Sequence, residues 1–77
     1  MKIKQYHIYK LKNNSEVVVI QNNFANKMSD FFVVLLYKNG NFESVDTVGK
    51  DCFMKEVGKL TEEEIGKAKE FYQSVMQ

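Results

Sequence analysis

Four lysines and one tyrosine recur at even positions within the first twelve residues, and this spacing is the first chemical signal in the chain. In an extended strand, side chains two residues apart share one face. Lysine ammonium groups neutralise phosphates and an aromatic ring can stack on a base, so this face is a candidate nucleic-acid surface. The alternative is that the lysines protect an edge strand from pairing with another chain. The set comprises Lys2, Lys4, Tyr6, Lys10 and Lys12.

A second polar group lies in the loop that follows the next apolar run. Its amide side chains offer donors and acceptors, so the loop is a candidate contact for RNA or a protein partner, although amides also hydrogen-bond within their own turns. Phe24 interrupts the amides, and an aromatic ring there either fills the core or contacts a partner. The candidate residues are Gln21, Asn22, Asn23, Phe24 and Asn26.

Groups for catalysis are few. His7 is the only histidine, Cys52 is the only cysteine, and all eleven basic residues are lysine. These counts exclude a zinc site of Cys and His ligands and an internal disulfide, and no metal or cofactor is expected. Cleavage of a phosphodiester without metal needs a base, an acid and a cation. Glu16 or His7 could supply the base and Lys12 or Lys38 the cation, but nothing in the sequence brings them together, so no catalytic residues are expected.

Composition limits the remaining classes of protein. Of 77 residues, 44% are hydrophobic and 27% are charged, as in an ordinary globular domain, so one domain over residues 1–77 is expected. The longest apolar run, residues 31–37, is too short to cross a bilayer, and no signal peptide is visible. We therefore expect no membrane partner and a cytoplasmic location with a reduced cysteine.

The charge is spread unevenly along the chain. The net charge is +1, but residues 1–15 carry four lysines and no acid, whereas the remainder carries seven lysines and ten acids. The sequence therefore predicts a basic N-terminal strand and an acidic remainder.

Four strands are expected in the first two thirds of the chain. Loose alternation predicts a strand over residues 2–12, and a β-branched run predicts a buried strand over residues 17–21. Residues 31–38 are apolar on both faces of a further strand, so both faces should be covered. Asn39 and Gly40 suit the central positions of a type I′ turn, which predicts a hairpin into a strand over residues 41–48.

Two helices are expected after these strands. Asp51 can cap a short helix that ends at Gly58. Thr61 and Glu64 form a capping box for a second helix over about residues 61–76. The predicted fold class is α+β: a small, strongly curled antiparallel sheet of about four strands followed by two C-terminal helices.

Several segments resemble the MazF/PemK-type toxin family. Residues 18–23 (VVIQNN) and 25–29 (ANKMS) are similar to the family's "IIQND-x-GN-x-xSP" segment. Residues 45–50 (VDTVGK) and 57–64 (VGKLTEEE) look like the family's ending, where a strand reading "IRTIDK" precedes a helix, a "kigkLs-x-ee" turn and the last helix. Ile8 and Tyr9 match the place of its "GDVY" strand, although the Gly-Asp pair is absent. The resemblance covers most of the chain in two blocks.

The resemblance implies a small, SH3-like, partly open barrel that dimerises. Active members of the family cut single-stranded RNA without a metal, using an arginine just before the second strand and a threonine or serine at the end of the third. In this chain the arginine position falls near Ser15 or Glu16 and the hydroxyl position near Lys38. Because the chain has no arginine and only residues 13–16 in the loop before the second strand, the resemblance implies the fold without the chemistry.

The leading hypothesis is a small non-catalytic binding protein with this fold. Its expected partner is RNA or a protein of a toxin or defence system (a toxin, an antitoxin or a defence nuclease), and a phage or mobile-element inhibitor is one concrete form. The alternatives are an active endoribonuclease toxin that cleaves single-stranded RNA and a structural homodimer module. A homodimer is also expected because residues 31–37 are apolar on both faces of one strand in a short chain.

Overall fold

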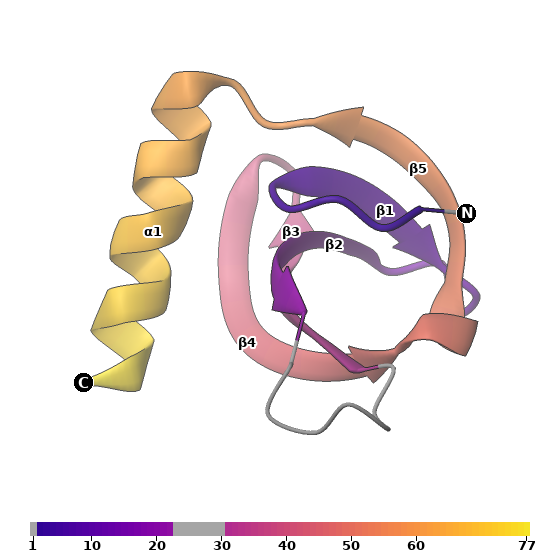
Figure 1. The fold of residues 1–77 in the computed structure, drawn as a ribbon. Helices are drawn as coiled ribbons and strands as arrows, with labels where there is room; N and C mark the ends of the chain where they lie inside the picture. The colour runs from indigo at the N-terminus through magenta and orange to yellow at the C-terminus, as the bar shows by residue number, and fades with distance from the viewer. Residues whose placement is uncertain (1, 23–30) are drawn as a thin grey trace.

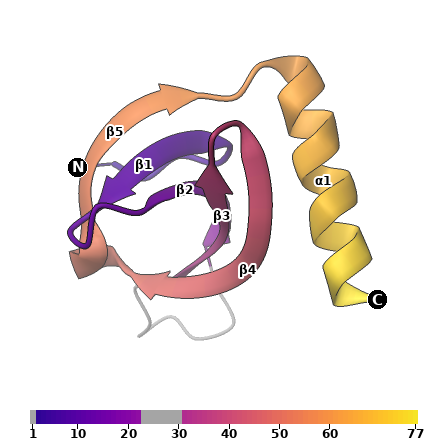
Figure 2. The ribbon, with the colours of Figure 1, turned by 180° about the vertical axis from the view of Figure 1, so that it is seen from behind.

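The chain folds as an α+β arrangement of one open antiparallel sheet and a C-terminal helix (Figure 1, and from behind in Figure 2). The computed structural model describes residues 2–22 and 31–77. Within these residues the sheet has five strands in the order β4-β3-β2-β1-β5, so its two edges are β4 and β5. The elements are β1 (His7–Leu11), β2 (Glu16–Asn22), β3 (Phe31–Lys38), β4 (Asn41–Gly49), the 3₁₀ turn η1 (Lys50–Cys52), β5 (Phe53–Lys59) and α1 (Glu62–Met76).

The expected number of strands and helices is wrong. The segment predicted as a first helix forms η1 and β5, so the described residues contain five strands and one α-helix, and the sheet is open rather than strongly curled. The helix prediction relied on local caps at Asp51 and Gly58, and a cap is worth about 1 kcal/mol. In the fold, β5 pairs with β1 from His7–Lys59 to Leu11–Phe53 and buries the Phe53 ring, which is worth roughly 1.5–3 kcal/mol.

The first strand begins later than expected. The chain turns at residues 5–6, and β1 starts only at His7. Tyr6 has a φ of 64°, a conformation that costs a non-glycine residue roughly 1–2 kcal/mol. Two backbone hydrogen bonds stabilise it: Tyr6 N–H donates to the Val19 carbonyl at 2.7 Å, and Leu60 N–H donates to the Tyr6 carbonyl at 3.0 Å. The turn therefore connects the segment before β1 to β2 and to Leu60, which directly follows β5.

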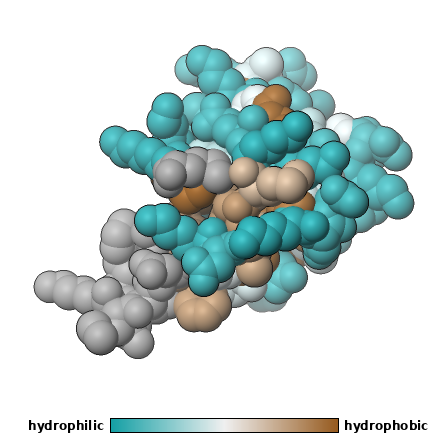
Figure 3. All heavy atoms as spheres, turned by 90° about the vertical axis from the view of Figure 1, so that its right-hand side faces the viewer, coloured by the Kyte–Doolittle hydropathy of each residue, from teal (hydrophilic) through white to brown (hydrophobic). Residues whose placement is uncertain are grey.

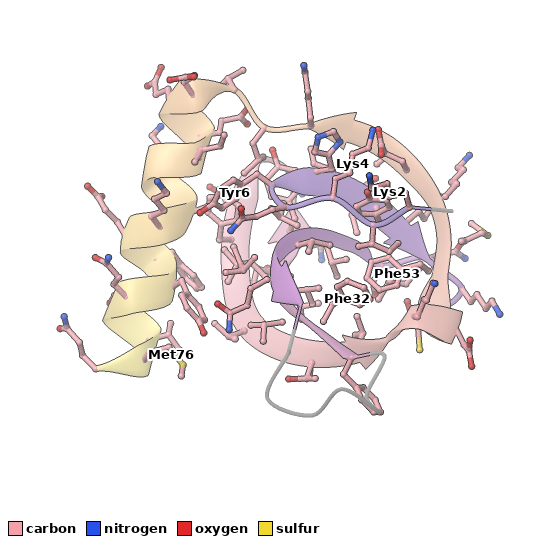
Figure 4. All side chains as sticks on the ribbon, viewed as in Figure 1. Lys2, Lys4, Tyr6, Phe32, Phe53 and Met76 are labelled. Carbon is pink, nitrogen blue, oxygen red and sulfur yellow. The ribbon has the colours of Figure 1, made fainter. Side chains whose placement is uncertain are left out.

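One face of the sheet carries an aromatic cluster, which we call the inner cluster. Phe53 on β5 lies edge-on to Tyr9 on β1, with ring centroids 5.3 Å apart, and edge-on to Phe32 on β3 at 5.5 Å (Figure 4). Since β2 and β1 lie between β3 and β5 in the sheet, the sheet bends for these rings to meet. The buried members are Tyr9, Leu11, Val17, Val19, Phe32, Val34 and Phe53.

The opposite face packs against α1 and forms a second core, the helix-side cluster. The capping box is confirmed, because Thr61 Oγ1 accepts the Glu64 N–H at 3.2 Å and Glu64 Oε1 accepts the Thr61 N–H at 2.9 Å. The ring of Phe71 on α1 lies 6.1 Å from that of Phe42 on β4. The buried members of the helix-side cluster are Val18, Ile20, Leu35, Leu60 and Ala68.

Among the described residues, no helix has the length and apolarity needed to cross a membrane.

Both faces of β3 are covered within one chain. Phe32 and Val34 belong to the inner cluster, and Leu35 belongs to the helix-side cluster. A tight turn joins β3 to β4 through Asn39 (φ 52°) and Gly40 (φ 81°), which confirms the predicted hairpin. The apolar argument for a second subunit therefore loses its basis, and a homodimer stays a prediction.

Truncation of Phe53 tests the position of β5. Phe53→Ala should lower the free energy of unfolding by about 3–5 kcal/mol, because it leaves a cavity between Tyr9 and Phe32. Met54→Ala is the matched control, since this neighbouring side chain is 44% exposed, and it should change stability by no more than about 0.5 kcal/mol. Urea denaturation measures both, and equal losses would contradict the inward position of Phe53.

Candidate nucleic-acid interface

Seven of the eleven lysines lie where β1 and β5 meet. Because β5 pairs with β1, and because Lys12 N–H donates to the Cys52 carbonyl at 2.9 Å, residues 50–59 lie beside residues 2–12 despite their separation in sequence. These two stretches carry only two carboxylates, Asp51 and Glu56. We call the lysines the basic edge; they are Lys2, Lys4, Lys10, Lys12, Lys50, Lys55 and Lys59.

The other end of the molecule carries the opposite charge. On β4, at the far edge of the sheet, and on α1, six carboxylates accompany only Lys67 and Lys69. These carboxylates are Glu43, Asp46, Glu62, Glu63, Glu64 and Glu70. Folding thus converts the uneven charge along the sequence into a separation in space, and such a field steers a polyanion toward the basic edge.

The single lysine face expected from alternation is wrong, because the turn at Tyr6 interrupts it. Lys2 and Lys4 lie together in the segment before β1, near β1 and β5, whereas Tyr6 lies toward α1 (Figure 4). Tyr6 packs on the helix-side cluster, where Lys69 Nζ lies 5.9 Å from its ring centroid. The ring is therefore separated from the lysines with which it was expected to act, and its contact with a base stays a prediction.

Three of the seven lysines of the basic edge, Lys50, Lys55 and Lys59, were missed from the sequence. Lys55 lies opposite Lys10 in the register of β5 and β1, and Lys59 lies opposite His7. No local signal identifies them, because residues 53–59 do not alternate and carry a single β-branched residue, Val57. Only the pairing with β1 brings these lysines and Lys50 to the site.

The basic edge contains an unrelieved repulsion. Lys10 and Lys55 are directly opposite in the register, and like charges in that relation destabilise a sheet. Among the described residues the ion pairs are His7–Glu56 and Lys67–Glu63, so no carboxylate there is paired with a lysine of the basic edge. A phosphate bound between these ammonium groups would remove the repulsion.

Two apolar side chains are exposed among these lysines. Met54 and Val57 are each 44% exposed, and each lies where the register of β5 against β1 shifts by one residue. Such bulges turn an edge strand away from pairing with another strand. Figure 3 shows this side of the molecule, where hydrophobic residues gather in the middle and hydrophilic residues surround them. A base or an apolar side chain of a partner can pack there.

A polar hub connects β5 to the segment before β1. The Tyr9 hydroxyl accepts the Lys4 backbone N–H at 2.8 Å and points its proton toward Glu56 Oε1 at 3.2 Å and the Lys2 carbonyl at 3.3 Å. His7 Nδ1 lies 3.3 Å from Glu56 Oε2, without the alignment of a hydrogen bond. We call Tyr9, Glu56 and His7 the polar hub.

The surroundings of the polar hub set its charge. The His7 imidazole beside Glu56 is the main reason that the pKa of this carboxyl lies below its usual value. The hydrogen bond from Tyr9 and the Lys4 ammonium lower that pKa further, whereas partial desolvation opposes them. Desolvation raises the pKa of the Tyr9 hydroxyl, which therefore keeps its proton and remains a donor at neutral pH.

A separate hollow of about 480 Å³ lies where residues 13–16 meet the end of β3. Its lining includes Ser15 and Glu16, where the resemblance would place an arginine, and Lys38, where it would place a hydroxyl. Of the candidate catalytic groups, the hollow therefore joins Glu16 to Lys38, whereas His7 lies in the polar hub. Glu43 adds a second carboxylate to the lining. A base and a cation meet here without a guanidinium group.

The amide-rich loop lies only partly within the described residues. Gln21 is exposed on β2, and Asn22 is the last residue of that strand. Asn23, Phe24 and Asn26 lie outside the described residues, so a contact between this loop and RNA or a protein stays a prediction.

Comparison with known proteins finds no match among protein-family models, curated proteins or solved structures. Within residues 2–22 and 31–77, no group of three or more His, Cys, Asp or Glu side chains is placed to hold a metal ion.

The polar hub should make stability depend on pH at the acid end. Because the pKa of Glu56 is lower in the folded chain, its charged form stabilises the fold above the unfolded pKa of about 4.5, and this contribution is lost as pH falls through the folded value. Glu56→Gln should therefore lower the urea midpoint at neutral pH, and its difference from the parent chain should shrink as the solution is acidified. A difference that stays constant across the acid range would contradict this linkage.

Proposed function

We propose that this chain is a small non-catalytic binding protein with a MazF/PemK-like, SH3-type fold, and that it binds RNA through the basic edge. The observation that carries the proposal is the gathering of seven lysines from two separate stretches of sequence. The described residues give them no ion-paired carboxylate. Lysine contacts with phosphate supply affinity that does not depend on base sequence, as such a surface requires.

The arrangement of the strands supports the SH3-type part of the proposal. The inner cluster lies inside the bend of the sheet (Figures 1 and 4), and Phe53 of β5 contacts Phe32 of β3 across two intervening strands. The hollow at Glu16 and Lys38 lies where the resemblance expects the family's chemistry. These features fit a reduced version of that barrel.

Catalysis is left out of the proposal because the hollow has no guanidinium group. Lysine does not offer the planar, bidentate donor that arginine presents to a phosphate. The rival reading, an active endoribonuclease, would use Glu16 as the base and Lys38 as the cation, since these two side chains line one hollow.

A protein partner is the second candidate, and the exposed Met54 and Val57 favour it. An acidic surface with an apolar centre, on a toxin, an antitoxin or a defence nuclease, would match these residues and the lysines around them. RNA is preferred because seven lysines surround only these two exposed apolar side chains.

Salt dependence tests RNA binding. A mixed-sequence single-stranded RNA of about 12 nucleotides should bind with an affinity that falls steeply with salt, with a log–log slope of about −0.7 for each phosphate neutralised. Lys10→Gln with Lys55→Gln should reduce that slope by about 1.4 and weaken binding. Fluorescence anisotropy over a salt series measures both.

The matched control for this pair is Lys67→Gln with Lys69→Gln on α1, which removes the same charge outside the basic edge. We expect this control to change the slope little. If both double variants lost the same salt slope, the effect would come from net charge and not from the basic edge. An absence of RNA binding at low salt would favour the protein partner.

The missing arginine predicts an inactive chain. Single-stranded RNA incubated with the purified protein without metal should stay intact on a sequencing gel, and expression in a bacterial cell should not arrest growth. Cleavage that disappears on Glu16→Ala but persists on Glu43→Ala would overturn this expectation and establish the endoribonuclease.

A further inference from the structure

One buried hydroxyl holds the segment before β1. The Tyr9 ring has no exposed surface, and its hydroxyl accepts the Lys4 backbone N–H at 2.8 Å. The single hydroxyl proton points toward two acceptors, Glu56 Oε1 at 3.2 Å and the Lys2 carbonyl at 3.3 Å. The backbone of Lys2 and Lys4 is therefore attached to the same atom of β1.

The other hydrogen bonds of this segment lie at its end nearest β1, where the Gln5 side-chain amide donates to the Ile20 carbonyl at 2.8 Å and His7 N–H donates to the Lys4 carbonyl at 3.3 Å. Lys2 and Lys4 are exposed, precede the turn at Tyr6 and belong to no strand (Figure 4). Ile3, between them, packs on the inner cluster. Without the hydroxyl, the backbone entropy of a short exposed segment favours many conformations over one.

Glu56 is placed to orient this hydroxyl. It lies opposite Tyr9 in the register of β5 and β1, and the bulge at Val57 puts the two residues in that relation. By accepting the hydroxyl proton, the carboxylate leaves an oxygen lone pair free for the Lys4 N–H. The Lys4 ammonium lies close enough to Glu56 to favour its charged form.

We infer that Tyr9 and Glu56 are positioning residues for RNA binding, and that their hydrogen bond holds Lys2 and Lys4 where both ammonium groups add to the basic edge. The inference rests on the proposed function. It gives a buried tyrosine, which touches no RNA, control over two phosphate contacts.

Tyr9→Phe is the direct test, because phenylalanine keeps the buried ring and removes only the hydroxyl. With the same single-stranded RNA of about 12 nucleotides, the log–log salt slope should lose up to about 1.4, or about 0.7 for each of two phosphate contacts. Tyr37→Phe is the matched control, since the Tyr37 hydroxyl also donates to a glutamate, Glu64 Oε2 at 3.2 Å, and this pair lies away from the N-terminal segment. It should leave the slope unchanged.

A mutant cycle separates positioning from general damage to the fold. In a Lys2→Gln, Lys4→Gln background, Tyr9→Phe should change the slope no further, because the lysines that it positions are absent. The NMR order parameter of the Lys4 amide should also fall in Tyr9→Phe and stay high in Tyr37→Phe. Glu56→Ala, at an exposed position, is a second variant that should lower the slope even though it removes a negative charge.

Three results would overturn the inference. The first is a salt slope that is unchanged in Tyr9→Phe but reduced in Lys2→Gln with Lys4→Gln. The positioning role of Tyr9 would then be wrong, whereas the proposed RNA binding would stand. The second is a loss in Tyr9→Phe that persists in the lysine-free background, which indicates general distortion. The third is a parent chain that binds no RNA at low salt, which removes the proposed function and the inference together.

Discussion

The pairing of β5 with β1 is the contact on which the rest of the structure depends. It joins Tyr9 to Glu56, 47 positions later in the chain, and its most distant pair is His7 and Lys59, so it encloses most of the chain. The entropy lost on closing a loop grows only with the logarithm of its length, so burial of Phe53 against Tyr9 and Phe32 can offset it. The same pairing ends at Lys59, from which the chain continues through Leu60 into α1.

The parts of the fold that follow from local chemistry were predictable from the sequence. Asn39 and Gly40 fit a turn that needs two positive φ angles, and Thr61 and Glu64 satisfy each other's backbone groups at a helix start. β5 has no such local signal, because its stability comes from a partner strand far away in sequence. The turn at Tyr6 could not be predicted from the sequence either. A tyrosine disfavours a positive φ angle, and only hydrogen bonds with the distant Val19 carbonyl and Leu60 N–H stabilise it here.

The candidate site likewise has one part that the sequence could predict and one part that it could not. The N-terminal lysines were identified from composition and spacing, because four lysines without an acid stand out in any chain of this length. The sequence could not identify Lys50, Lys55 and Lys59 as part of the site, because their place beside Lys10 and Lys12 exists only in the folded sheet. Spacing alone also placed Tyr6 with the lysines, whereas in the structure the turn at this residue packs its ring on the helix-side cluster.

The charges also decide between the two places where a phosphate could bind. The lining of the hollow holds two carboxylates, Glu16 and Glu43, and one lysine, Lys38. On the basic edge, Lys10 and Lys55 repel each other with no carboxylate paired to either among the described residues. An anion therefore meets repulsion at the hollow and relieves repulsion at the edge. In the proposed function, RNA is therefore directed away from the hollow and toward the strand pair that holds the fold together.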